Sequence, residues 1–199
     1  MDKKTRGRVA FAVCGSFCTL DAALVQAERL VQDGWQMIPV MSYAAAGQDT
    51  RFGTAAHWRA RLEQIAGRPV LDTMQGAEPL GPKNQADCLV IAPCTGATLA
   101  RLAAGLSDTP VSLAAKSLLR AAKPVVIALS TNDGLAASGE NIARLAQRKH
   151  YFFVPYGQDD WLRKPQSLKA RLELLPATLD AALQGRQLQP LLREPLSGE

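Results

Sequence analysis

Histidine is scarce in this chain of 199 residues, which contains only His57 and His150. Neither lies near a cysteine in the sequence, so no zinc-binding pattern can be assembled and we expect no metal site. The patterns G-x-G-x-x-G, G-K-[ST] and G-x-S-x-G are also absent, which leaves a dinucleotide site, a P-loop and a serine hydrolase elbow without support. No nucleophile–base pair emerges from the remaining residues.

Long apolar runs and basic clusters are missing as well. The longest uninterrupted apolar stretches, such as 125–129, are far too short to cross a bilayer, so we expect no membrane association. The basic N-terminal stretch is not followed by a signal-peptide cleavage pattern, and we expect a cytoplasmic protein. The net charge is +5, but Lys and Arg are scattered without interleaved aromatic residues, which argues against nucleic-acid binding. A small anionic substrate would use positive charge equally well.

The cysteines are expected to be buried thiols. In the cytosol they would not form disulfides, and their positions in or beside apolar strands are typical of small core residues. The four are Cys14, Cys18, Cys88 and Cys94.

Apolar runs of strand length alternate with segments of helical period. The expected strands are 9–14, 35–43, 87–93, 123–130 and 151–155. The expected helices are 20–32, 56–67, 97–106, 110–122, 141–148 and 168–186, the last interrupted at Pro176. This alternation requires parallel strands with helical crossovers, so we predict an α/β fold, a three-layer doubly wound parallel sheet. Residues 1–199 should form a single domain, with 1–7 and 193–199 as loose tails.

Ligands of such folds gather at the carboxyl ends of the strands, which selects the loops 15–19, 42–53, 93–98 and 130–135. The first loop opens into a helix N-terminus, where free N–H groups and the hydroxyls of Ser16 and Thr19 favour a phosphate. The alternative is an ordinary N-cap turn formed by either hydroxyl. In the third loop we expect Pro93 to end the strand and Thr98 to cap the helix. A site without acid–base residues suggests that a cofactor carries the chemistry.

The segment "APCTGATLARLAAGLSD" (92–108) resembles the signature P-x-[ST]-A-N-T-x-A-K-x-A-x-G-x-x-D of homo-oligomeric flavin-containing cysteine decarboxylases and their relatives, which bind FMN. The motifs "GSFCT", "TRFG", "EPLGPK", "STND", "PYGQDD" and "LLP" are similar, in order, to the family formed by the second of the two dipicolinate synthase subunits, from about Gly7 to Leu192. The resemblance implies a flavodoxin/Rossmann-like flavoprotein fold.

The resemblance also implies a function. In that family the second subunit works with a nicotinamide-binding subunit, which uses NAD or NADP, to oxidise a dihydrodipicolinate-type intermediate to dipicolinate. This happens during sporulation, which implies the cytoplasm of the mother cell. The substrate is a cyclic dicarboxylate, and Arg51 and Lys83 are the expected substrate-binding cations. The cofactor-binding residues that the resemblance implies are Gly15, Ser16, Thr19, Ser42, Pro93, Cys94, Thr95, Thr98, Ser130 and Asn132.

Departures from the decarboxylase pattern keep other functions open. Lys83 lies in the segment where the decarboxylases carry a catalytic His, and Ser130–Asn132 replace their P-x-M-N loop; both argue against decarboxylation. Ala97 stands in place of the signature Asn. The alternatives are an FMN-dependent decarboxylase or prenyl transferase, and a non-catalytic partner subunit that has lost its cofactor. The apolar content of 98–122 exceeds one buried face and predicts a homo-oligomer.

Overall fold

The structure of the chain is a computed structural model that describes residues 5–195. Five parallel strands form the sheet in the order β2-β1-β3-β4-β5. They are β1 (Gly7–Val13), β2 (Trp35–Met41), β3 (Cys88–Cys94), β4 (Val125–Thr131) and β5 (Tyr151–Phe153). Two short antiparallel strands, β7 (Leu168–Ala170) and β6 (Tyr156–Gln158), extend the sheet from the end of β4.

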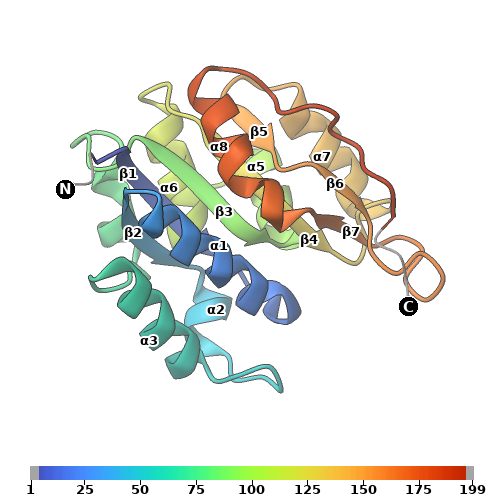
Figure 1. The fold of residues 1–199 in the computed structure, drawn as a ribbon, viewed down its shortest axis with the longest axis horizontal. Coiled ribbons are helices and arrows are strands. Elements are labelled where there is room, and N and C mark those ends of the chain that lie inside the picture. Colours follow the sequence, from blue (N-terminus) through green and yellow to red (C-terminus); the bar gives the residue numbers. More distant parts are fainter. Residues whose placement is uncertain (1–4, 196–199) are drawn as a thin grey trace.

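Helices cover both faces of the sheet, as Figure 1 shows. One face carries α1 (Leu20–Gln32), α3 (Ala55–Ala66) and α8 (Leu175–Leu183). The other carries α4 (Met74–Ala77), α5 (Gly96–Ala104), α6 (Pro110–Leu119) and α7 (Ala137–Ala146). Short elements complete the chain: η1 (Phe17–Thr19), α2 (Tyr43–Gly47), η2 (Glu78–Leu80) and η3 (Leu172–Leu174). The predicted three-layer doubly wound fold is confirmed.

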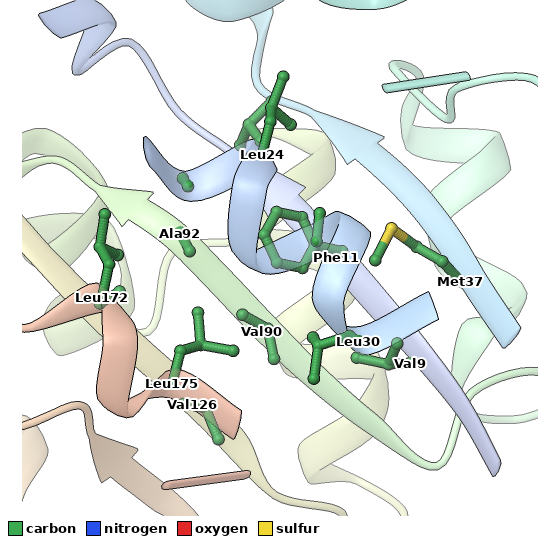
Figure 2. Close-up of a cluster of buried hydrophobic side chains, with 14 of the residues drawn as sticks. Val9, Phe11, Leu24, Leu30, Met37, Val90, Ala92, Val126, Leu172 and Leu175 are labelled. Atoms are coloured by element: carbon green, nitrogen blue, oxygen red, sulfur yellow. The ribbon is translucent and has the colours of Figure 1, made fainter. Parts of the chain in front are cut away.

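The period-two pattern of β1 shows how the sheet separates its two cores. Val9, Phe11 and Val13 point into the core beneath α1 and α8, and the alternate residues point into the other core. In Figure 2, helix α1 passes over Phe11 and its Leu30 lies beside Val9, while Leu175 of α8 faces Val90 and Val126. Every residue of β3 is buried, as expected for a central strand covered on both faces. Because β3 is packed on both faces, the position of its carboxyl end is fixed, and so is the start of the loop that follows it.

The closing helix was predicted to begin too early. Residues 168–170 form strand β7 instead, because Leu168 and Ala170 are buried while Lys169 between them is not, which is the period of a strand. Pro176 lies in the first turn of α8, where proline is tolerated, so it helps to start the helix rather than interrupting it.

Smaller differences concern loops and ends. The second strand ends at Met41 rather than at 43, because Ser42 caps the short helix α2. Pro93 lies within β3, with a register shift in the pairing between Ile91 and Cys94, so it does not end the strand. The predicted loose tails are partly held: Gly7 begins β1, and the Arg193 N–H donates to the Tyr156 carbonyl at 2.9 Å. The remaining tail residues, 1–4 and 196–199, lie outside the described part.

Two kinds of feature are absent from residues 5–195. No helix in this range combines the length and apolarity that a membrane-spanning helix requires. The same residues contain no group of three or more metal-ligating side chains that could hold an ion.

Candidate functional site

Three hydroxyl groups meet where the loops after β1 and β4 lie side by side. Ser16 Oγ lies 2.9 Å from Thr19 Oγ1 and 2.7 Å from Ser130 Oγ, and the Thr19 and Ser130 oxygens are 2.6 Å apart. We call these three side chains the hydroxyl cluster. Ser130 is more than a hundred residues from the other two in sequence, so the sheet topology brings it to them. Ser16, Thr19 and Ser130 were all predicted at the site, and the structure joins them.

The helix that starts at this cluster lacks a side-chain cap. Ser16 and Thr19 occupy the N-cap positions of η1 and α1, and neither side chain bonds to the helix backbone there. By contrast α2, α3, α5 and α6 are capped by Ser42, Thr54, Thr95 and Thr109. The helices α7 and α8 also lack a side-chain cap, but their N-cap residues, Ala136 and Leu174, carry no side-chain hydroxyl. The N–H groups of Thr19 and Leu20 donate to the carbonyls of Ser16 and Phe17, so the uncapped start leaves the first N–H groups of η1 for an external anion. The alternative of an ordinary N-cap turn is therefore not what the structure shows.

Gly15 lets the first loop approach its neighbour closely. A Cβ at this position would lie 3.3 Å from the Ala44 Cβ and 3.5 Å from the Phe17 ring. Phe17 in turn packs against the buried core beneath α1. Ser42 holds the neighbouring segment: its N–H donates to Val13 O at 3.0 Å, and its Oγ accepts from Ala45 N at 3.2 Å. Ser42 is thus beside the site, but its hydroxyl is engaged in capping α2.

The loop after β3 uses its hydroxyls internally. Thr95 Oγ1 accepts from the Thr98 backbone N–H at 3.3 Å, so Thr95 is the cap of α5 and the prediction that Thr98 caps it is wrong. The Thr98 hydroxyl is buried and donates to Cys14 Sγ at 3.3 Å. Pro93 and Cys94 are buried within β3. The hydroxyls of Thr95 and Thr98 are thus engaged in hydrogen bonds inside the protein, and Pro93 and Cys94 are buried.

Burial keeps three thiols protonated. It raises the pKa of Cys14 to about 11 and that of Cys88 to about 12, and it raises the pKa of Cys94 well above its usual 9.0. Neutral buried thiols are poor nucleophiles, so these three are core residues, as expected. Cys18 is exposed in the first loop, and the expectation of burial is wrong for it.

Asp133 organises the loop after β4. Its Oδ1 accepts hydrogen bonds from the Thr131 hydroxyl and, at 2.8 Å, from the Ser138 hydroxyl. The Thr131 hydrogen bond is the largest influence, and it lowers the pKa of Asp133, with Ser138 acting in the same direction against the effect of burial. Asn132 beside it is exposed to solvent.

This network closes around Gly96 at the start of α5. A Cβ on Gly96 would lie 2.5 Å from Ser138 Oγ, 2.8 Å from Thr131 Oγ1 and 3.0 Å from Asp133 Oδ1. Gly96 and Ser138 were not predicted as site residues. Gly96 stands where the decarboxylase signature has Ala, and that difference was the available signal. Nothing in the local pattern pointed to Ser138.

The two predicted substrate cations lie in different places. Arg51 is at the tip of the turn closed by Thr50 and Gly53, and its guanidinium lies over the Phe52 ring, 4.9 Å from the ring centre. This hairpin, between α2 and α3, follows the carboxyl end of β2 and projects away from the sheet in Figure 1. Both Arg51 and Phe52 are exposed.

Lys83 lies at the opposite edge of the sheet. It precedes β3, and its neighbour Asn84 accepts a hydrogen bond from Lys123, which precedes β4. Both strands begin here, so the position is the amino edge. Within one chain the structure therefore does not bring Lys83 together with Arg51 or with the hydroxyl cluster.

The site as built can bind an anion but offers few groups for proton transfer. The carboxylate of Asp133, in the loop after β4, accepts hydrogen bonds from two hydroxyl groups. Both hydrogen bonds favour its ionised form, so Asp133 is not a ready proton donor. Neither histidine lies in these loops. The geometry therefore suits the holding of a phosphate-bearing group more than acid–base catalysis.

Comparison with known proteins identifies the family of the chain. A model of the flavoprotein family matches residues 1–170. The chain is 44% identical over 191 residues to the second subunit of dipicolinate synthase from Bacillus subtilis (strain 168), and 96% of each protein is covered. It is also 44% identical to the corresponding dipicolinate synthase subunit from Bacillus halodurans C, whose crystal structure superposes with a TM-score of 0.88 over 96% of this chain and 98% of that one.

More distant structures share the fold. DmrB of Burkholderia xenovorans, solved in complex with FMN, is 22% identical with a TM-score of 0.67, over 91% of this chain and 97% of that one. The FMN-dependent cysteine decarboxylase SpaF is also 22% identical, with a TM-score of 0.66 over 91% of this chain and 98% of that one. The family match covers most of the chain, and the higher identity extends over nearly all of it. The chain therefore belongs to the flavoprotein family, and within that family to the proteins that form the second subunit of dipicolinate synthase.

Proposed function

We propose that this chain is the FMN-binding subunit of a dipicolinate synthase, and that it acts with a nicotinamide-binding subunit to oxidise a dihydrodipicolinate-type intermediate to dipicolinate. The observation that carries the proposal is the uncapped start of α1 beside the hydroxyl cluster. The 44% identity to the second subunit of dipicolinate synthase supports the choice of reaction. The proposal places the chain in the mother-cell cytoplasm of a sporulating bacterium.

The loops suit the phosphate end of FMN. Gly15 leaves room at the turn, Ser16 and Thr19 contribute hydroxyls, and the first N–H groups of η1 complete the donor set. Ser130 holds these hydroxyls in place from β4. Of the remaining predicted contacts, Ser42, Thr95 and Asn132 lie in the same group of loops, whereas Pro93 and Cys94 lie within β3 and Thr98 lies in the first turn of α5. When bound, FMN supplies a two-electron acceptor.

The reaction balances without another reagent. The dihydro ring loses two electrons and two protons; a hydride is accepted in the end by NAD or NADP on the nicotinamide-binding subunit, and one proton is released. The role of this chain's residues is to bind and orient. Arg51 is proposed to hold a substrate carboxylate through charge-assisted hydrogen bonds. A decarboxylase role has less support, because Lys83 replaces the family's His and lies away from the site.

The Ser16→Asp variant tests the phosphate loop. Asp is a favourable N-cap residue, so the helix should still form, while its charge repels a phosphate. We expect the affinity for added FMN to fall at least about tenfold, an effect of roughly 1.4 kcal/mol. The measurement is a titration followed by flavin absorbance, with Thr73→Asp at the cap of α4 as the matched control. Unchanged FMN affinity in the folded Ser16→Asp protein would remove the phosphate from this loop.

The reaction itself is tested by reconstitution. Dipicolinate formation is followed by its ultraviolet absorbance with only the nicotinamide-binding subunit, with only this chain, and with both together. We expect turnover at a substantial rate only in the mixture. Full activity without this chain would leave it as a non-catalytic partner, and the FMN titration then decides whether it still binds a cofactor.

A further inference from the structure

A second cavity opens at the edge of the sheet opposite the proposed flavin site. Its volume is about 370 Å³, within the roughly 300–1,000 Å³ typical of small-molecule sites. It is bordered by the C-terminal end of α5, by one side of α6 and by residues 148–151, where β5 begins. The hydroxyl cluster lies at the carboxyl ends of the strands, so the two places are separated by the length of the sheet.

The cavity is lined by cations and by no carboxylate. Lys116, Arg148 and Lys149 carry formal positive charge, and the His150 imidazole adds a further polar group. Among residues 5–195, none of the three cations forms a salt bridge with Asp or Glu, although many other arginines on the surface do. No acidic side chain of the described chain therefore pairs directly with these three cations, which are all exposed.

Helix ends offset only part of this charge. Arg148 donates to the Leu102 and Ala103 carbonyls at 3.1 and 2.6 Å, so it caps the C-terminus of α5. Lys116 lies in the last turn of α6 and donates to Ser107 Oγ at 3.3 Å. Each helix C-terminus is equivalent to roughly half a negative charge. Two such ends against three full cations leave an excess of about two positive charges.

The walls between the cations are apolar. Leu102 and Tyr151 are buried, Leu119 is half-buried and Leu106 is 52% exposed at the rim. Lys116 comes from α6, while Lys149 comes from the turn before β5. A ligand that suits this lining has an apolar body and about two negative charges.

We propose that this cavity is a second ligand site that takes a planar aromatic dicarboxylate, and that dipicolinate itself binds there. The cations and apolar walls select an anionic ligand with an apolar body, while the choice of an aromatic dicarboxylate, and of dipicolinate in particular, rests on the proposed function. Such a site binds the product at a distance from the place where it is formed. It allows dipicolinate to act on the protein without competing for the reaction site.

Titration calorimetry of the full chain with dipicolinate, in the presence of a metal chelator, tests this site. We expect saturable binding that weakens at least about tenfold in the double variant Lys116→Gln/Lys149→Gln, since two cations are lost from one ligand. Arg148 is left in place because it caps α5. The control, Arg68→Gln/Arg186→Gln, removes the same charge from two exposed positions elsewhere and should bind within about twofold of the parent.

Two further ligands test the chemical class. Pyridine-2-carboxylate lacks the second carboxylate and should bind at least about tenfold more weakly, whereas inorganic phosphate should not compete. Equal weakening in the Arg68/Arg186 control, or equal affinity for phosphate, overturns the proposal, because the interaction is then one of general charge.

The outcome separates this proposal from the proposed function. Dipicolinate binding that is lost in Arg51→Ala but retained in Lys116→Gln/Lys149→Gln locates the ligand at the reaction site and overturns the second site. Binding lost only in the lysine variant establishes the second site, whether or not the reconstituted mixture forms dipicolinate.

Discussion

The backbone at Gly96 lies directly against the hydrogen-bonded side chains of Thr131, Asp133 and Ser138. A methyl group there would come within 3.0 Å of three polar atoms, from Thr131, Asp133 and Ser138. Overpacking of this kind typically costs about 1–3 kcal/mol. We therefore expect Gly96→Ala to lower the free energy of unfolding by an amount in this range, measured by urea denaturation. Gly47→Ala, which meets nothing within 4 Å, is the matched control and should differ little from the parent.

Asp133 links the same network to pH. Because hydrogen bonds lower its pKa in the folded protein below the ordinary 3.8, the ionised carboxylate stabilises the fold above that pH. This contribution is lost as the pH falls through the folded-state pKa, below 3.8. We expect the stability difference between the parent and Asp133→Asn to be constant near neutral pH and to shrink in that acidic range. Urea denaturation at several pH values measures it, with Asp33→Asn at the exposed end of α1 as a control for loss of one carboxylate. A difference that stays constant into acid would contradict the assignment.

At the scale of elements, the buried strands were predictable and the antiparallel extension was not. β3 and β4 are continuous apolar runs, and their period and length identify them without tertiary information. Residues 168–170 are Leu, Lys and Ala, which are all common in helices. Their strand conformation comes from pairing with Ser130 and with Tyr156–Gln158, which lie elsewhere in the sequence.

In the candidate site too, the position of the loops was predictable from the sequence, but the contacts between their side chains were not. The loops at the carboxyl ends could be chosen from topology alone, and the resemblance selected Ser16, Thr19 and Ser130 within them. The contacts of these hydroxyls with one another, and the absence of a cap at α1, depend on three-dimensional placement. Lys83 shows a different error: a segment that precedes a strand lies at the amino end of that strand, so the sequence order alone already placed Lys83 away from the carboxyl ends.

The helices at 98–122 do not support an oligomer in the way expected. Seven residues of α6 are buried within the chain, where α4 and η2 cover its second face. Leu106 is the large apolar residue of this segment that is exposed, and most of the others lie in other elements, among them Tyr43 in α2, Phe52 in the hairpin, and Trp161 with Leu162 between β6 and β7. We still propose a homo-oligomer, now through these segments. Light scattering should give a multiple of 21.4 kDa, and a strictly monomeric mass at micromolar concentration would contradict the proposal.

For the whole molecule, the proposed function requires the exposed Arg51 hairpin to be shielded from water when the substrate is bound. Arg51 is exposed in the isolated chain and stacks on Phe52, and no carboxylate among residues 5–195 forms a salt bridge with it. Its charge is therefore available to a substrate carboxylate once the loops, a second copy or the nicotinamide-binding subunit exclude water around it. Removal of one member of a desolvated charge pair costs roughly 2–5 kcal/mol.

We expect Arg51→Ala to reduce dipicolinate formation by about two orders of magnitude, since each tenfold change corresponds to about 1.4 kcal/mol. The measurement is coupled turnover with the nicotinamide-binding subunit, together with a thermal melt of the variant. Because Arg51 lies in an exposed turn, the melting temperature should stay close to that of the parent. Arg51→Lys keeps the charge but loses bidentate geometry, and it should recover only part of the activity. Arg68→Ala, an exposed arginine in the loop after α3, controls for the loss of one surface charge. Full turnover by a folded Arg51→Ala protein would show that this residue does not bind the substrate. The chain would then contribute to the reaction only by binding the cofactor at the hydroxyl cluster.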